Sequence, residues 1–371
     1  MTFSMWWKSG LLVAMSCVIS VLIGEAAVAK FLPQNLSVWG MTRDGLTSHV
    51  PGVSVYMNQF GQQITINAHG MRDREHDVEK PKGTYHILVL GDSFMEALQL
   101  RFEESFPSLL ERELSTTTGK TIEIINGSVS GWGTDDELTY LTRYGLRFQP
   151  DLVLLGMTLH NDVTDNLMEK FHSFSNDRLV EKPSEELPFR EYVVLDIKAF
   201  LARHSHLMQL YLKYSRGNYV SQAASSLRSH VANLIDRSQD ASTTKGWMMT
   251  KQLLDKTRAV SEQAGAKFAV FLLPLAIQVS DQTLETFLKE QGMKKDDVII
   301  DQPQQIMFQW GRSAGVPVID LLPEFRDWVQ ERGDTLFLKN DGHWTPDGHR
   351  LAVRVVANRL MHDMNLERAA E

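Results

Sequence analysis

The sequence predicts an α/β protein of three layers, with a mostly parallel central sheet between two layers of helices. Two observations predict this fold. From residue 85 onward, short apolar runs alternate with longer helical stretches, as in a chain that builds a parallel sheet through crossover helices. The runs are also almost wholly apolar, with residues 151–157 nearly continuous, as strands buried on both faces are. Ligands of such sheets bind beyond the carboxyl ends of the strands.

The N-terminal segment, residues 1–30, is predicted to be a membrane anchor or a signal sequence. Residues 10–29 are nearly all apolar, and about 20 apolar residues are what a helix needs to cross a bilayer. Lys8 precedes this run, which favours an orientation with the N-terminus inside and the rest of the chain outside. A buried core helix is the alternative, but an all-apolar run ahead of a polar stretch fits it poorly.

Two routes of export stay open for this segment. The length of the apolar run and the nearby Glu25 favour an uncleaved anchor. Cleavage after Ala29 is the alternative, because residues 27–29 form an A-x-A site. With the anchor, we expect a single span in the inner membrane and the bulk of the chain on the periplasmic or extracellular side. With cleavage, we expect a secreted protein.

Charge and cysteine content exclude several classes of protein. The chain of 371 residues has a formal net charge of −8, which argues against a nucleic-acid partner. Its single cysteine, Cys17, lies in the N-terminal apolar run, so neither an intramolecular disulfide nor a cysteine-based metal site is expected. His160 and Asp162 lack a third ligand at a convincing spacing, so we predict no metal and no cofactor.

Three regions follow the N-terminal segment. Residues 31–83 form a turn-rich extension that is partly β-like, because runs such as 53–56 alternate as strands do. Residues 84–365 form the main domain, interrupted at about 165–245 by a mostly helical insertion that covers or borders the site. The insertion contains a helix at 197–214. The expected strands of the main domain are 86–90, 121–125, 151–157, 267–273 and 316–320, and its expected helices are 103–114, 135–146, 247–264 and 345–361.

The first motif with chemical potential is Gly91-Asp92-Ser93, directly after the first strand of the main domain. A serine at a strand-to-helix turn exposes its hydroxyl at the edge of the sheet. The backbone N–H of Ser93 lies at the start of a helix, where it is ready to stabilise an oxyanion. The alternative is that Asp92 or Ser93 only caps the helix.

Two further loops supply candidate oxyanion donors. Gly131 lies in the glycine-rich loop 126–134 after the second strand, where its backbone N–H is a possible second donor. Asn161 follows the third strand, and its amide side chain is a possible third donor, with Asp162 in support. An ordinary tight loop and an asparagine that holds its own backbone are the alternatives.

The last motif, residues 340–349, contains Asp341 and His343 just before the final helix. His343 is the candidate general base, and Asp341 would orient its other ring nitrogen and stabilise the imidazolium. For His349, on the final helix, packing or surface polarity is the preferred interpretation. A hydroxyl, a base, an acid and oxyanion donors are the set that nucleophilic catalysis needs, and all are available at strand ends.

Together these four motifs resemble the SGNH/GDSL hydrolase superfamily, whose blocks match Ser93, Gly131, Asn161 and His343, with Asp92, Asp162 and Asp341 beside them. The resemblance covers residues 85–364 apart from the insertion, and it implies a flavodoxin-like sheet. More narrowly, the chain resembles membrane-anchored bacterial members with a Gly-x-Arg-Asp-type element, here residues 70–73. Relatives of that subgroup often occur with polysaccharide export and cell-surface modification.

One departure concerns the acid. The commoner pattern of the superfamily places Asp three residues before the catalytic His, where this chain has Asn340. Asp341 lies two residues before His343, a form that resembles polysaccharide acetyl-transfer relatives. If Asp341 points away from His343, a Ser–His dyad remains.

The resemblance implies a serine esterase that removes acyl groups, in particular O-acetyl, from a cell-envelope or exported polysaccharide through an acyl-enzyme on Ser93. An O-acyltransferase with the same triad is the first alternative, and a non-catalytic glycan-binding or assembly factor is the second. The expected partners are an acylated carbohydrate or small ester, the inner membrane, and the polysaccharide export machinery. Trp132 and Trp344 lie inside motif loops, where stacking on a sugar and packing in the core are both open.

Overall fold

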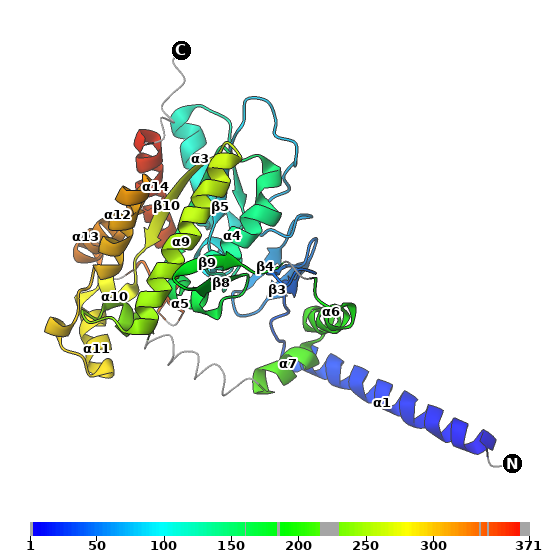
Figure 1. Ribbon diagram of the computed structural model, residues 1–371. Coiled ribbons are helices and arrows are strands. Elements are labelled where there is room, and N and C mark those ends of the chain that lie inside the picture. The colour runs from blue at the N-terminus through cyan, green and yellow to red at the C-terminus, as the bar shows by residue number, and fades with distance from the viewer. Residues whose placement is uncertain are drawn as a thin grey trace.

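The computed structural model describes residues 3–159, 161–183, 186–215, 230–333, 335–339 and 341–363. Its centre is a five-stranded sheet in the order β11-β10-β7-β5-β6, and every neighbouring pair in it is parallel. The prediction of a three-layer fold around a mostly parallel sheet is confirmed (Figure 1). The strands are β5 (Tyr85–Leu90), β6 (Ile122–Asn126), β7 (Leu152–Thr158), β10 (Lys267–Leu273) and β11 (Val318–Asp320).

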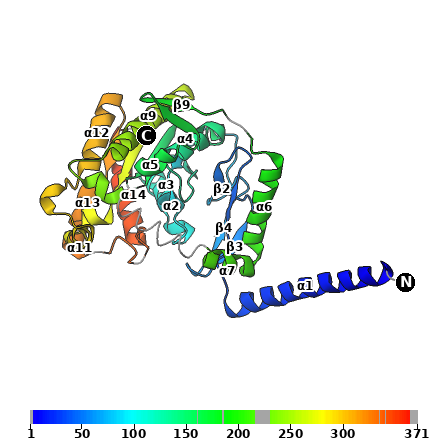
Figure 2. The same cartoon turned by 60° about the horizontal axis from the view of Figure 1, so that its bottom comes forward.

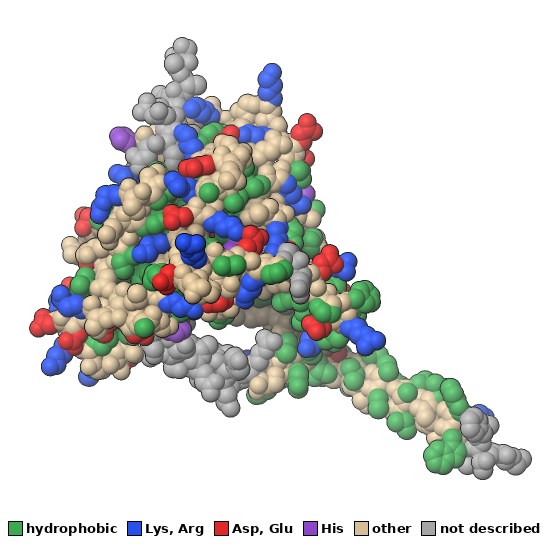
Figure 3. All heavy atoms as spheres, in the orientation of Figure 1, with side chains coloured by type: hydrophobic (Ala, Val, Ile, Leu, Met, Phe, Trp, Pro, Cys, Tyr) green, Lys and Arg blue, Asp and Glu red, His purple; other side chains and the backbone are tan. Residues whose placement is uncertain are grey.

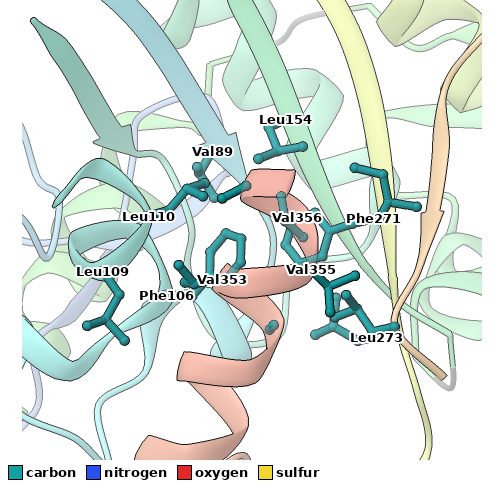
Figure 4. Packing of buried hydrophobic residues seen from close by; sticks show 14 of the residues in the cluster. Val89, Phe106, Leu109, Leu110, Leu154, Phe271, Leu273, Val353, Val355 and Val356 are labelled. Carbon is teal, nitrogen blue, oxygen red and sulfur yellow. The ribbon is translucent and has the colours of Figure 1, made fainter. Parts of the chain in front are cut away.

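Helices cover both faces of this sheet because successive strand residues point to opposite faces. One face packs against α3 (Phe106–Thr118), α13 (Leu322–Arg332) and α14 (Pro346–Asp363). The core there contains Val89, Leu154 and Phe271 from the strands, against Phe106 and Val356 from the helices (Figure 4). The other face packs against α4 (Thr134–Arg143), α9 (Ala241–Gln263) and α12 (Gln302–Ala314), through the alternate strand residues.

The order of the strands determines where a site can form. The chain passes from β5 to β6 on one side and then returns to β7 on the other, so the strand order reverses at β5. Ligands of open parallel sheets bind beyond the carboxyl ends of the strands at such a point. Two short helices begin there, α2 (Ser93–Glu96) after β5 and α5 (Asp162–Asp165) after β7.

Small antiparallel pairs lie outside the central sheet. Within residues 31–83, β1 (Trp39–Met41) pairs with β2 (Thr47–His49), and β3 (Ser54–Met57) pairs with β4 (Gln62–Thr65). Between β10 and β11 the sequence patterns gave no helices, but the structure forms three. They are α10 (Ala276–Val279), α11 (Asp281–Gln291) and α12. Single turns of 3-10 helix occupy Phe102–Glu104, Gly145–Phe148, Asn166–Met168 and Lys295–Asp297.

The insertion differs from its predicted form in two respects. It contains a hairpin of β8 (His172–Ser175) and β9 (Arg178–Glu181), which the sequence patterns did not predict. The single helix expected over 197–214 is two helices, α6 (Phe189–His204) and α7 (His206–Ser215). They separate at Ser205, whose backbone is extended with φ −126° and whose hydroxyl accepts a hydrogen bond from the Met208 N–H at 2.9 Å. A serine in that position caps a new helix, which the apolar pattern did not indicate.

The N-terminal helix α1 (Phe3–Phe31) projects away from the rest of the molecule (Figure 1). The most apolar window of 18 residues within Trp6–Phe31 has a mean hydropathy of 2.3, and none of that window is buried. Among the described residues this is the helix that is long and apolar enough to cross a membrane. Length and composition of this kind are shared by membrane anchors and signal sequences.

Candidate active site

Ser93 and His343 meet at the carboxyl edge of the sheet, although 250 positions separate them in the sequence. The Ser93 Oγ lies 2.7 Å from the His343 Nε2, a hydrogen-bond distance. The other ring nitrogen of His343, Nδ1, contacts a carboxylate oxygen of Asp341. Serine, histidine and aspartate therefore form one continuous hydrogen-bonded chain, and Asp341 points toward His343 rather than away from it.

The turn that carries Ser93 depends on close packing at Gly91. A Cβ atom there would lie 2.6 Å from the Met95 side chain and 3.3 Å from the Gly156 carbonyl oxygen of β7. Only glycine therefore allows β5 to turn so sharply into α2. The Asp92 carboxylate then caps α2 by accepting a hydrogen bond from the Phe94 N–H at 3.0 Å. As a result Ser93 becomes the first residue of the helix and stays partly exposed.

Asp92 also orients the candidate amide donor. The Asn161 Nδ2 donates a hydrogen bond to the second Asp92 oxygen at 2.9 Å. An amide nitrogen carries two protons, so the other proton remains for a substrate oxygen. Asp162 holds the turn after β7, because its carboxylate accepts the Thr158 N–H at 2.9 Å. The two predicted supporting aspartates thus contact the loops that carry Ser93 and Asn161.

The glycine-rich loop after β6 is fastened beside the same turn. The Val129 N–H donates to the Gly91 carbonyl at 3.3 Å, and the Ser130 N–H donates to the Glu96 carboxylate at 3.0 Å. Gly131 follows with a φ of +80°, a left-handed conformation that favours glycine. It is exposed, and it is not among the residues that line the pocket at Ser93.

Glu96 is a buried centre of contacts that the sequence patterns missed. Its carboxylate accepts hydrogen bonds from Ser130 and from the Trp39 indole at 3.1 Å, and it contacts the His49 ring. The Arg72 guanidinium, from the predicted Gly-x-Arg-Asp-type element, donates to backbone carbonyls of Glu96, Ala97 and Leu100. These contacts tie the 31–83 extension to the end of α2. The signal in the sequence was a glutamate three residues after Ser93, just beyond the Gly91-Asp92-Ser93 motif.

The loop that carries His343 is held by backbone and ring contacts. The His343 carbonyl accepts the Leu338 N–H at 2.8 Å, and Phe337 forms an isolated β-bridge with Trp344. The Phe94 ring, next to Ser93, lies 4.8 Å from the His343 ring between centroids. The imidazole is therefore held by the Phe94 ring as well as by the contacts of its two nitrogens with Ser93 and Asp341.

The aromatic and histidine candidates around the motifs belong to the core. Trp132 and Trp344 are fully buried, and the Trp132 indole donates to the Thr47 carbonyl at 2.8 Å. They pack in the core rather than offering a face to a sugar. His349 is also buried, its ring accepts the Phe106 N–H at 3.1 Å, and burial lowers its pKa to about 3. This neutral histidine holds α3 against α14, in line with the packing interpretation.

A group of buried carboxyls lies behind the site. Burial raises the pKa of Asp92, while the Asn161 amide lowers it in part. Burial raises the pKa values of Glu137 and Asp162 well above the ordinary range. The Asp92 carboxylate raises both further, and the Glu137 carboxylate also raises the pKa of Asp162. Both Glu137 oxygens are buried and lack hydrogen-bond partners within the described part of the chain. Burial thus favours the protonated, neutral form of these carboxyls.

Glu137→Gln is expected to stabilise the protein at alkaline pH. Folding raises the pKa of Glu137 above its unfolded-state value of 4.5. The contribution of this group to the free energy of unfolding is therefore fully present below pH 4.5, and it is lost as the pH rises toward the pKa of the folded state. Glutamine cannot ionise, so the variant avoids this loss. We expect the Tm of the variant to exceed the wild-type Tm by about 2–4 °C at pH 8, which corresponds to roughly 1 kcal/mol.

The measurement is thermal unfolding of both proteins from pH 5 to pH 8. The control is Glu113→Gln, at an exposed position of α3. The Tm of this variant should equal the wild-type Tm at every pH. A gain that stays constant across this pH range, or a loss at pH 8, would contradict the buried-proton interpretation.

A pocket of about 320 Å³ opens beside the Ser93 hydroxyl. One wall is polar and contains Asp92, Thr158, Asn161 and His343. Another part of the lining is apolar. Apart from Val231, which lies in the predicted insertion, it comes from the segment around α10 and α11, where the sequence patterns located no site residue. It contains Val231, Leu275, Ile277 and Phe287. These side chains belong to a hydrophobic cluster around α10 and α11, so the cluster shapes the space beside the nucleophile candidate.

The structure thus brings together Ser93, Asp92, Asn161, Asp341 and His343 at one pocket. Gly131 lies on an adjoining loop. His160 and Asn340 lie outside the described residues. Within the described residues, no group of three or more His, Cys, Asp or Glu side chains is arranged to hold a metal ion.

The parallel sheet places a serine after β5, an asparagine after β7 and a histidine before the last helix, which is the order of the motifs that resemble the SGNH/GDSL superfamily. A family match supports this resemblance for the C-terminal part of the chain. Residues 235–371 match the family described as "SGNH hydrolase-like domain, acetyltransferase AlgX". The matched segment includes Asp341 and His343. Residues 235–371 are therefore similar to an SGNH hydrolase-like domain.

Individual relatives are more distant or shorter matches. An arylesterase of Vibrio mimicus is 42% identical over 71 residues, which is 19% of this chain and 35% of the relative. The chain thus matches about a third of the length of that curated relative. Among solved structures, a psychrotrophic esterase of Pseudoalteromonas is 12% identical, with 76% of this chain and 98% of that chain covered and a TM-score of 0.40. An acetylxylan esterase of Geobacillus stearothermophilus is 12% identical, with 77% and 97% covered and a TM-score of 0.41.

Proposed function

We propose that this protein is a serine esterase that cleaves acyl esters through an acyl-enzyme on Ser93. The observation that carries the proposal is the contact of the Ser93 Oγ with the His343 Nε2 at 2.7 Å, with Asp341 on the other ring nitrogen. The arylesterase relative and the SGNH hydrolase-like family support the class of reaction. The pocket beside Ser93 supplies room for the group to be cleaved.

In the proposed first step, His343 takes the proton from the Ser93 hydroxyl as its oxygen attacks the ester carbonyl. The carbonyl oxygen becomes an oxyanion, which accepts hydrogen bonds from the second proton of the Asn161 amide and from the Ser93 N–H. The resemblance implies the Gly131 N–H as a further donor, although Gly131 does not line the pocket at Ser93. Protonated His343, stabilised by Asp341, then gives its proton to the leaving alcohol. The product is an acyl-serine and a free alcohol.

In the second step, water enters, His343 takes one of its protons, and the hydroxyl oxygen attacks the acyl-serine. Collapse of that intermediate returns the proton to Ser93 and releases the acid. If a sugar hydroxyl enters in place of water, the same groups transfer the acyl chain to the sugar. The word acetyltransferase in the family description favours this second candidate function.

We further propose that the substrate is an O-acetylated glycan of the cell envelope or an exported polysaccharide. In this proposal residues 1–30 anchor the protein in the inner membrane, 31–83 form an extension, and 84–365 form the catalytic domain on the outer side. Support for the anchor comes from the apolarity of Trp6–Phe31 and from contacts of Glu25 with α7, which cleavage after Ala29 would remove. A link to polysaccharide export machinery belongs to the same proposal.

The proposal is tested with the full-length protein in detergent and p-nitrophenyl acetate. We expect release of p-nitrophenol, and acid quenching during turnover should trap an acetyl group on the peptide that contains Ser93. A soluble oligosaccharide added to the reaction separates the two candidates. Transfer predicts an acetylated sugar, whereas hydrolysis predicts acetate alone. A folded protein that never acquires an acetyl group on Ser93 would contradict both and favour a binding role.

Asn161→Ala is expected to lower kcat by about 10²–10³-fold, because one oxyanion donor is lost. KM should change by less, since the amide binds the transition state more strongly than the substrate. Steady-state kinetics on p-nitrophenyl acetate measure both values. The control is Asn58→Ala, at an exposed position on the β3–β4 turn, which should leave kcat unchanged. A kcat within a few-fold of wild type would remove Asn161 from the oxyanion site.

A further inference from the structure

The two helices of the insertion expose a continuous apolar surface. Tyr211 and Tyr214 of α7 are 65% and 79% exposed, and Ile197 and Phe200 of α6 are 54% and 52% exposed. On α7, the apolar residues 207, 210, 211 and 214 recur at the spacing of one helical face. We call this surface the interface patch, and its residues are Ile197, Phe200, Leu201, Leu207, Met208, Leu210, Tyr211 and Tyr214.

The interface patch is fastened to the apolar N-terminal helix. The Glu25 carboxylate of α1 accepts hydrogen bonds from the Ser205 hydroxyl at 2.7 Å, the His206 N–H at 2.7 Å and the Leu207 N–H at 3.0 Å. A carboxylate at the start of α7 also interacts favourably with the dipole of that helix. The Leu207 side chain packs 3.6 Å from the Cβ position of Gly24. Figures 1 and 2 both show α7 beside the end of α1.

The position of Glu25 along α1 fixes the depth of the patch. From Trp6 to Glu25 the helix rises over nineteen residues, or about 28 Å, which is close to the thickness of a hydrocarbon core. Trp6 and Trp7 are exposed at the far end, where tryptophan commonly lies at a membrane surface. If α1 spans the bilayer, Glu25 and the start of α7 therefore lie at its opposite surface.

We propose that the interface patch lies on the outer surface of the membrane that α1 crosses, with its apolar side chains at the boundary between headgroups and acyl chains. Tyrosine is enriched at that boundary because its ring is apolar and its hydroxyl is polar. The patch adjoins α1 through the packing of Leu207 at Gly24, and apolar side chains of α1 are exposed along the projecting helix (Figure 3). This continuity favours lipid over a second copy or another protein. The inference goes beyond the proposed chemistry and rests on α1 as a retained anchor.

Two attachments hold a domain more firmly than one. Residues 32–38, which follow α1, lie outside regular secondary structure, so the contacts of Glu25 with the start of α7 are what restrain the domain relative to α1. Contact of the interface patch with lipid adds a second attachment, and the tether keeps the patch close to the membrane, so that even weak binding is effective. The domain is then held at a fixed orientation above the membrane.

The test uses the full-length protein in vesicles of phosphatidylethanolamine and phosphatidylglycerol. Cys17→Ser removes the single native thiol, and one cysteine at a time is introduced for a nitroxide label at Tyr211 or Tyr214. Accessibility of the label to oxygen, which partitions into lipid, is compared with accessibility to a water-soluble nickel chelate. The control labels are at Tyr56, exposed on β3, and at Val13, in the middle of α1.

We expect labels at 211 and 214 to show an oxygen-to-nickel accessibility ratio several-fold above that at 56, and below that at 13. A ratio at 211 and 214 equal to that at 56 overturns the proposal, because the patch is then in water. Low accessibility to both reagents also overturns it, because a protein surface then covers the patch. Water-like values at 13 overturn it together with the anchor. Esterase activity of each labelled protein, measured in parallel, keeps these outcomes separate from failure of the proposed chemistry.

Discussion

Ser93→Ala is expected to lower kcat for p-nitrophenyl acetate by about 10⁶-fold, the scale of loss when the nucleophile of a serine hydrolase is removed. The hydroxyl 2.7 Å from the His343 Nε2 is the group that would form the acyl-enzyme. Without it, only binding and the oxyanion donors remain, and these leave residual catalysis of about 10³–10⁴ over water. Progress curves at high enzyme concentration, corrected for spontaneous hydrolysis, measure the residual rate.

The fold should survive this change, because Ser93 is partly exposed and the cap of α2 comes from Asp92. Ser54→Ala on the exposed strand β3 is the matched control and should retain wild-type turnover. Turnover in a folded Ser93→Ala protein that stays within tenfold of wild type would refute the assignment of the nucleophile.

Asp341→Asn is expected to lower kcat by about 10⁴-fold, as loss of the acid does in a Ser-His-Asp triad. The Asp341 carboxylate contacts the His343 Nδ1, so it holds the tautomer in which Nε2 accepts the serine proton. Asparagine at this position keeps the size of the side chain, but its amide nitrogen can donate to Nδ1 and favour the wrong tautomer. The measurement is kcat as a function of pH, with Asp347→Asn, on the exposed start of α14, as the control.

A dyad makes a different prediction for the same variant. If His343 acts without the acid, Asp341→Asn reduces turnover far less than Ser93→Ala does. A loss of tenfold or less, with an unchanged pH profile, would therefore contradict the triad and support the dyad. The position of the aspartate two residues before the histidine makes this comparison informative, because the commoner spacing is three.

The sequence by itself determined the central sheet and the location of the motifs. Near-continuous apolar runs such as Leu152–Thr158 can be buried on both faces only in a parallel sheet with helices on each side. The carboxyl ends of parallel strands meet at one edge, so Ser93 and Asn161, each following a strand, lie at the same edge of the sheet. The parallel pairing of β5 with β7 brings together these two residues, which are far apart in the sequence.

Tertiary structure alone decided the contacts that have no local pattern. Glu96 meets Ser130 and His49 across three separate segments, and nothing in its own neighbourhood in sequence indicates those partners. The apolar wall of the pocket, with Leu275 and Phe287, resembles ordinary core residues until its position beside Ser93 is known. The break at Ser205 likewise depends on Glu25, 180 residues earlier in the chain. The periodicity of apolar residues indicates which side of a helix or strand is buried. It does not indicate which distant residue packs against that side, because this depends on the packing of the whole chain.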